Sequence, residues 1–148
     1  VGAGFVVRAR TVPVGTKVDV QKITDPTVEA QWEAWTTLFS NAASLFGLGL
    51  FWTGAYVVLV YQDAASLSVK WRRSTDGVNW SAEQTAYSLA PYIAYFSGAS
   101  GGSSQSGLML SYNAQLYWAA YNPAADTWAA PASADKAAID KPASKVAN

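Results

Sequence analysis

Three tryptophans at a constant spacing restrict the fold of this chain more than any other feature. Trp32, Trp80 and Trp128 are separated by 48 and 48 residues. A turn-forming cluster lies upstream of each one, namely Thr24-Asp25-Pro26, Ser74-Thr75-Asp76-Gly77 and Asn122-Pro123. A fixed period of this length is typical of repeat architectures, in which each repeat is one supersecondary unit. We therefore interpret the chain as three copies of one unit.

Short segments rich in Val, Tyr and Trp precede these turns, and they align between the units. The segments directly before the turns are 17–23, 66–73 and 115–121. One step upstream, three more strand candidates align at 3–8, 55–60 and 106–111, and a further pair aligns at 50–54 and 94–98. The unit therefore reads strand A, a glycine-bearing turn, strand B, a turn, strand C, a polar turn, the Trp, and strand D. The expected units are 1–44, 45–90 and 91–136, with 137–148 as a tail or a closing strand A.

A four-stranded sheet of this size has two faces to cover, so such sheets must stack on one another. Radial stacking of four-stranded sheets is the β-propeller, which has about four to eight blades. The sequence therefore predicts an all-β fold, a β-propeller of four-stranded antiparallel blades with three repeats per chain. Two chains joined head to tail by strand exchange would form six blades, or a longer chain would hold the remaining blades. A sandwich or prism of three sheets is the alternative.

The second turn resembles the Asp-box of sialidase-like propellers. The family pattern reads Ser, any, Asp, any, Gly, any, Thr, Trp, and Ser74, Asp76, Gly77 and Trp80 fill its defined places. Asn79 stands where Thr is usual, and one residue is missing between Asp and Gly. An Asp side chain can accept N–H groups of its own turn, and Gly supplies a positive φ. The resemblance implies a structural turn with the Trp packed beneath it, and no catalytic role for Asp76.

The first and third units have degenerate copies of this turn, in which Trp32 and Trp128 are the expected structural residues. The repeats, through 23–26 and 31–38, are also similar to propeller-type adhesin regions of phage tail and receptor-binding proteins. That resemblance implies a location that is extracellular or on a virion surface.

Composition argues against several functional classes. The chain has no Cys and no His, which excludes disulfides, Ser-His-Asp catalysis and zinc sites built on these residues. Ten basic residues balance ten acidic ones, so nucleic acid is not an expected partner. Only four Arg are present, two of them adjacent, and most acids lie in expected turns. We therefore expect no enzyme, no metal and no cofactor, and the lack of an 18-residue apolar run argues against membrane insertion.

The aromatic share of 14% then becomes the best indication of function. Aromatic walls with a few placed polar groups suit small-molecule and sugar sites. The candidate ligand-binding residues are Trp52, Trp71, Arg72, Trp118, Gln115 and Tyr121. Three hypotheses remain: a lectin-like module that binds a glycan or cell-surface receptor, a structural module of a larger particle, and a fragment of a glycoside hydrolase-type propeller. Aromatics exposed around a concave face would favour the first, and aromatics buried between sheets would favour the second.

Overall fold

The computed structural model describes residues 4–12, 15–25, 27–28, 32–41, 45–88, 95–99, 106–112 and 115–133. These residues form strands joined by turns, and all strand pairs are antiparallel. The all-β prediction is confirmed. Within the described ranges, no helix is long and apolar enough to cross a membrane. Residues 137–148, predicted as a tail or closing strand, lie outside these ranges.

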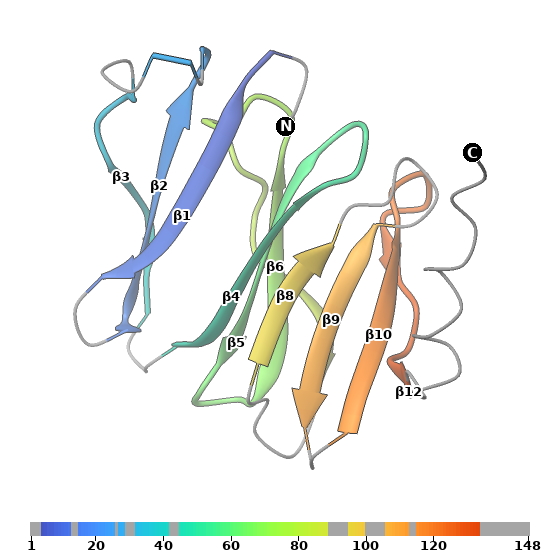
Figure 1. Cartoon of the computed structure of the whole chain (residues 1–148). Coiled ribbons are helices and arrows are strands. Elements are labelled where there is room, and N and C mark those ends of the chain that lie inside the picture. The colour runs from blue at the N-terminus through green and yellow to red at the C-terminus, as the bar shows by residue number, and fades with distance from the viewer. Residues whose placement is uncertain are drawn as a thin grey trace.

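The strands form three sheets that follow one another in chain order (Figure 1). The first sheet has the order β1 (Val6–Val12), β2 (Lys17–Ile23) and β3 (Thr36–Ser40). The second has the order β4 (Leu45–Trp52), β5 (Val57–Asp63), β6 (Ser68–Ser74) and β7 (Gln84–Ser88). The third runs from β8 (Tyr95–Ala99) through β9 (Gly107–Tyr112) and β10 (Gln115–Asn122) to β11 (Thr127–Trp128), and β12 (Ala132–Ser133) also pairs with β10.

The first two sheets have the same hydrogen-bond registers. The first residue of β1 lies opposite the last residue of β2, and the first residue of β5 lies opposite the last residue of β6. A bulge after the second residue of β2 interrupts its pairing with β3, and the same bulge interrupts the pairing of β6 with β7. Positions in the two sheets can therefore be compared one by one. On this basis Val20, the fourth residue of β2, corresponds to Trp71, the fourth residue of β6.

The repeat tryptophans share one backbone contact. The residue after each of them donates its N–H to a carbonyl near the end of the strand before the turn, at 3.0 Å in the first unit, 2.9 Å in the second and 2.8 Å in the third. The donor and acceptor pairs are Glu33 to Lys22, Ser81 to Arg73, and Ala129 to Ala120. This bond places the three Trp side chains at equivalent points of their sheets.

Apolar side chains fill the space on both faces of the second sheet. Because β5 has a sheet on either side, its first six residues are all buried. Towards the first sheet, Leu59 and Tyr61 pack with Val18 and Leu45. Towards the third sheet the buried cluster is larger and consists of Phe51, Val58, Val60, Val69, Trp71, Leu108, Leu110, Ala119 and Tyr121. Each fully buried side chain of this size contributes about 1.5–3 kcal/mol, so the second sheet depends on both of its neighbours.

Several strand boundaries differ from the sequence-based expectation. The strand expected at 3–8 is β1 (Val6–Val12), and the strand expected at 50–54 is β4 (Leu45–Trp52). The second strand B was expected at 55–60, but β5 begins at Val57. The reason lies in the preceding turn, where the Thr53 hydroxyl accepts the N–H groups of Ala55 and Tyr56 at 3.3 and 2.9 Å. In the third sheet, strand D is reduced to the two-residue strands β11 and β12.

Candidate functional site

A hydrogen-bonded turn connects β6 to the segment that leads into β7. The Asp76 carboxylate accepts the side-chain amide of Asn79 at 2.7 Å and the backbone N–H groups of Asn79 and Val78, both at 2.8 Å. The Ser74 hydroxyl donates to Asp76 at 3.0 Å and accepts the N–H of Gly77 at 2.8 Å. The amide of Asn79, followed by the two backbone N–H groups, holds the pKa of Asp76 well below its usual value. Asp76 is therefore an ionised acceptor that closes the turn.

The same turn lies directly against the first sheet. Gly77 has φ of +76°, and a Cβ atom there would approach Cγ2 of Val7 to 2.6 Å and a ring carbon of Phe5 to 3.1 Å. Only Gly combines this backbone conformation with so close an approach. The contact brings Val78 and Trp80, which follow in the chain, over the side chains of β2 and β3.

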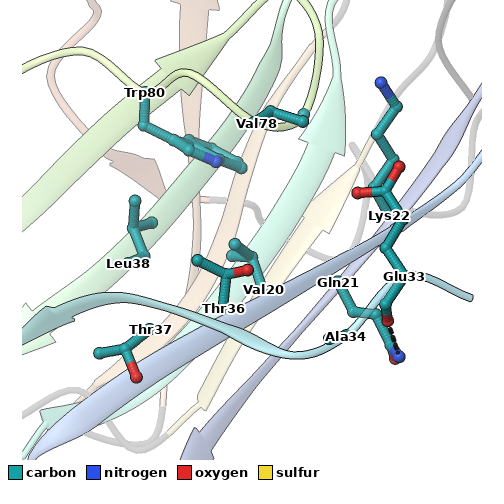
Figure 2. A pocket seen from close by; sticks show the side chains of 11 residues that line it. Val20, Gln21, Lys22, Glu33, Ala34, Thr36, Thr37, Leu38, Val78 and Trp80 are labelled. Carbon is teal, nitrogen blue, oxygen red and sulfur yellow. Dashed lines mark hydrogen bonds between the residues drawn. The ribbon is translucent and has the colours of Figure 1, made fainter.

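A pocket of about 260 Å³ lies between this turn and the first sheet. Trp80, Leu38 and Val20 gather on one side of it, and the polar ends of Lys22 and Glu33 lie on the other (Figure 2). The full lining is Val20, Gln21, Lys22, Glu33, Ala34, Thr36, Thr37, Leu38, Gly77, Val78 and Trp80. The pocket therefore combines an aromatic and aliphatic wall with hydroxyl, carboxylate and ammonium groups.

The pocket borders a position at which equivalent sheets differ. Between the second and third sheets, the Trp71 ring packs beside the repeat tryptophan Trp128, with ring centroids 6.3 Å apart. Between the first and second sheets, the repeat tryptophan is Trp80, and the position of Trp71 is occupied by Val20. Valine lacks the indole that fills this space in the other interface. Val20 and Trp80 both line the pocket.

Several of the polar residues that line the pocket make contacts within the first sheet. The Gln21 side-chain amide donates to the backbone carbonyl of Glu33, which orients the start of the segment that leads into β3 (Figure 2). The Glu33 side chain is exposed, and the Lys22 ammonium lies 5.0 Å from the centroid of the Phe5 ring. The hydroxyl of Thr37 is already used, because it donates to Asp19 at 2.9 Å.

The indole nitrogen of Trp80 is buried without a hydrogen-bond partner among the described residues. Trp128, its equivalent in the third sheet, has the same unpaired nitrogen. The feature therefore belongs to the way the repeat tryptophan packs, and it does not by itself mark a ligand site.

Two of the predicted ligand-binding residues belong to the core. Trp71 is 2% exposed and Tyr121 is 3% exposed. Their rings are in edge contact with centroids 5.4 Å apart, and both pack against Trp128. Because strands β6 and β10 turn these side chains into the space between two sheets, burial removes both rings from any ligand surface.

The other four predicted ligand-binding residues are spread over the second and third sheets. Trp52 is half-buried in edge contact with Phe5, at 6.2 Å between ring centroids. Arg72 donates to the carbonyl of Ser81 at 3.0 Å. Trp118 lies over the backbone of Gly107 on the neighbouring strand, and exposed Gln115 accepts the hydroxyl of Tyr117 at 2.6 Å. The structure does not bring these residues together into one site.

The turns of the other two units use the same side-chain chemistry as Asp76. In the first unit, the Asp25 carboxylate accepts the N–H of Thr27 at 3.0 Å. In the third, the amide oxygen of Asn122 accepts the N–H groups of Ala124 and Ala125 at 3.0 and 3.2 Å. Trp128 packs against the core of its sheet pair, whereas the Trp32 ring is covered by the guanidinium of Arg8 at 4.0 Å.

Sequence reasoning missed most of the pocket. It singled out Gly77 and Trp80 only as structural residues, and it did not select Lys22, Glu33 or Thr36. One signal was present: aligning β2 with β6 places a valine where the second unit has a tryptophan. The other lining residues carry no signal in a single sequence, because they reach the pocket only when two sheets stack.

No known family model matches the chain, and the searches of curated proteins and of solved structures found no match either. Among the described residues, no group of three or more carboxylates is arranged to hold a metal ion.

Proposed function

We propose that the chain is a non-catalytic binding module that recognises a glycan through the pocket beside Trp80. The observation that carries this proposal is the replacement of the Trp71 ring by Val20 at the equivalent position of the first sheet. A position beside the Asp76 turn at which a smaller side chain replaces a ring is a natural place for an external ring to bind.

The dimensions and chemistry of the pocket suit a single sugar unit. Its volume of about 260 Å³ lies just below the range of ~300–1,000 Å³ that is typical of sites for drug-sized ligands. The Trp80 ring and Leu38 offer an apolar surface to the C–H face of a sugar ring. Thr36, Glu33 and Lys22 supply a hydroxyl, an acceptor and a donor for sugar hydroxyl groups.

Hydrolysis of the glycan receives less support than binding. Glycosidases in general use two carboxyl groups on either side of the scissile bond, and among the described residues that line this pocket Glu33 is the one carboxylate. The Tyr61 hydroxyl donates to the Glu83 carboxylate, which invites comparison with an activated tyrosine nucleophile. However, Tyr61 is 0% exposed, and burial together with its bond to Glu83 raises its pKa, which is the opposite of activation.

We also propose that the three sheets are propeller blades of a secreted or virion-surface protein. The support is their stacking in chain order, with the first two sheets in the same register. A six-bladed ring made by two chains receives less support. It would place another sheet on the outer face of the first sheet, where Arg8 and Arg10 occupy the positions of buried Leu59 and Tyr61 in the second sheet.

The test is to fill the pocket and measure glycan binding. The full chain is first screened on a glycan array, and the best-bound glycan is titrated by calorimetry. Val20→Trp restores the ring found at the equivalent position of the second sheet, and we expect at least a tenfold loss of affinity. Val28→Trp is the matched control, because Val28 is 38% exposed and does not line the pocket. Its affinity should stay within twofold of the parent chain.

Near-ultraviolet circular dichroism shows whether the Val20→Trp chain keeps its fold. If it does not, Val20→Phe and Glu33→Gln replace it, since the first adds a smaller ring and the second removes the pocket carboxylate. A folded pocket-filling variant that binds its glycan as tightly as the parent chain would refute the proposal, as would an array without any bound glycan.

A further inference from the structure

Two of the four arginines lie on the outer face of the first sheet. Arg8 and Arg10 alternate along β1 and therefore point to the same side, about 7 Å apart along the strand. By register they correspond to Leu59 and Tyr61 of β5, both of which are 0% exposed between the first and second sheets. The first sheet thus has two cations where the second has two core residues.

Each guanidinium is stacked on a tryptophan ring. Arg8 lies 4.0 Å from the centroid of the Trp32 ring, and Arg10 lies 4.0 Å from that of Trp35. Arg8 is also 5.1 Å from the Trp35 ring, so the four side chains form one alternating ladder. Cation–π contacts at these distances hold the guanidinium groups flat on the rings. The N–H donors at their edges that are not bonded to Gln21 or Asp19 can meet a ligand.

Two buried polar residues hold the ladder from beneath. Gln21 is 8% exposed and accepts the Nε–H of Arg8 at 2.7 Å. Asp19 is 6% exposed and accepts from Arg10 at 3.3 Å and from the Thr37 hydroxyl at 2.9 Å. Long cationic side chains on a surface strand normally keep their rotamer freedom, and fixing both of them reduces the entropy that a ligand contact would have to offset.

The charges on this face do not cancel. Asp19 balances Arg10, whereas Arg8 forms no ion pair within the described part of the chain. The side chain of Arg10 remains 48% exposed in spite of its ion pair. A guanidinium offers paired donors that match the two oxygens of a carboxylate or sulfate group.

We propose that the Arg8–Arg10 ladder is a second binding surface, specific for the anionic groups of an acidic glycan. The inference rests on the proposed glycan-binding function for the class of ligand, but its cationic groups, Arg8 and Arg10, do not line the pocket. Gln21 and Thr37 belong to both places, because they line the pocket and also take part in the hydrogen bonds beneath the ladder. Carboxylated and sulfated glycans share the chemistry that the ladder recognises. A second copy of this chain suits the face less well, because an apolar sheet placed on it would bury the unpaired charge of Arg8.

The experiment is native gel electrophoresis of the full chain through gels that contain dextran sulfate, polygalacturonate or neutral dextran. Retardation is expressed relative to a gel without polymer, which corrects for changes of protein charge. The expected result is retardation by the sulfated or the carboxylated polymer, or by both, but not by dextran. Comparing the gels with dextran sulfate and polygalacturonate shows whether sulfate or carboxylate groups are preferred. Added salt should weaken the retardation.

Substitutions then identify the surface. Arg10→Gln should weaken binding about tenfold, as expected for the loss of a charged hydrogen bond, whereas Lys70→Gln, a basic residue of the second sheet, should leave it unchanged. Asp19→Asn keeps an acceptor for Arg10 and Thr37 but removes a negative charge, so it should strengthen binding. The stronger binding expected of Asp19→Asn tests the proposal even if Arg10→Gln destabilises the fold.

The proposal would be overturned by equal mobility in all gels, by equal losses for Arg10→Gln and Lys70→Gln, or by a dimer in light scattering that Arg10→Gln dissociates. The pocket-filling Val20→Trp chain separates the two sites. If it loses neutral glycans but keeps its retardation by anionic polymers, both proposals stand. If it loses both, the pocket is the site for both ligands and the ladder proposal fails.

Discussion

The contact between the second turn and the first sheet leads to a prediction whose size can be worked out from the geometry. Replacing Gly77 by Ala adds a Cβ atom at a position with φ of +76°. The left-handed backbone costs a residue other than Gly about 1–2 kcal/mol. The added atom would also approach Val7 to 2.6 Å, which is closer than Cβ atoms are found, and overpacking of this kind costs about 1–3 kcal/mol. The expected loss is therefore about 2–5 kcal/mol.

Gly15→Ala is the matched control for this substitution. Gly15 has a similar φ of +68°, but a Cβ there would meet only backbone atoms of Leu45 at 3.6 and 3.8 Å, which is ordinary contact. This variant should lose only the backbone contribution of about 1–2 kcal/mol. The difference between the two variants isolates the packing of the turn against the first sheet.

Thermal unfolding followed by tryptophan fluorescence measures both variants. For a chain of this length, 1 kcal/mol shifts Tm by about 2–4 °C, so Gly77→Ala should lower Tm by about 5–15 °C and Gly15→Ala by clearly less. If the two variants unfold at the same temperature, the turn does not press on Val7. The placement of Trp80 over the pocket would then lose its physical basis.

Three further predictions concern stability. The pKa of Asp76 is lower in the folded chain than its unfolded value near 3.9, so the stability that its ionised carboxylate contributes is complete above that value and is lost as the pH falls below it. Asp76→Asn should therefore show a smaller decrease of Tm between pH 5 and pH 3 than the parent chain. Equal decreases in the two chains would contradict the hydrogen bonds assigned to Asp76. Trp71→Ala should lower the free energy of unfolding in urea by about 3–5 kcal/mol, and a loss below about 1 kcal/mol would show that the ring is not in the core. Gly107→Ala should destabilise the folded chain more than Gly15→Ala, because its Cβ would lie 2.4 Å from the backbone oxygen of Ala119. That oxygen cannot move without breaking the pairing of β9 with β10. Similar Tm values for the two variants would count against this close approach.

The turn chemistry could be anticipated from residue types because it is local. An Asp two residues after a Ser and directly before a Gly already holds the acceptor, the donor and the flexible backbone position that such a turn needs. The hydrogen bonds of Asp76 follow from this pattern. The same reasoning extends to Asn122, whose amide oxygen accepts two N–H groups of its own turn.

The direction in which an aromatic side chain points could not be anticipated in the same way. Polar residues near Trp71 and Tyr121 in the sequence favour a role as ligand contacts, yet both side chains are buried. In the second sheet, which has a sheet on both sides, alternation along the strand of Trp71 does not separate an inner face from an outer one. In the third sheet, the sequence does not show which face of β10 packs on the second sheet. Exposure is then decided by which sheets stack, which is not a local property.

The sequence by itself therefore determined the all-β class, the chemistry of the polar turns and the spacing of the tryptophans, since each of these depends on residues close together in the chain. Only the tertiary structure decided that Val20 would stand where Trp71 stands in the next sheet, leaving a pocket beside Trp80. It likewise decided that Arg8 and Arg10 would stack on Trp32 and Trp35. The physical reason is that a cavity or a ladder is made by side chains from different strands, and their distance depends on register and stacking rather than on separation along the chain.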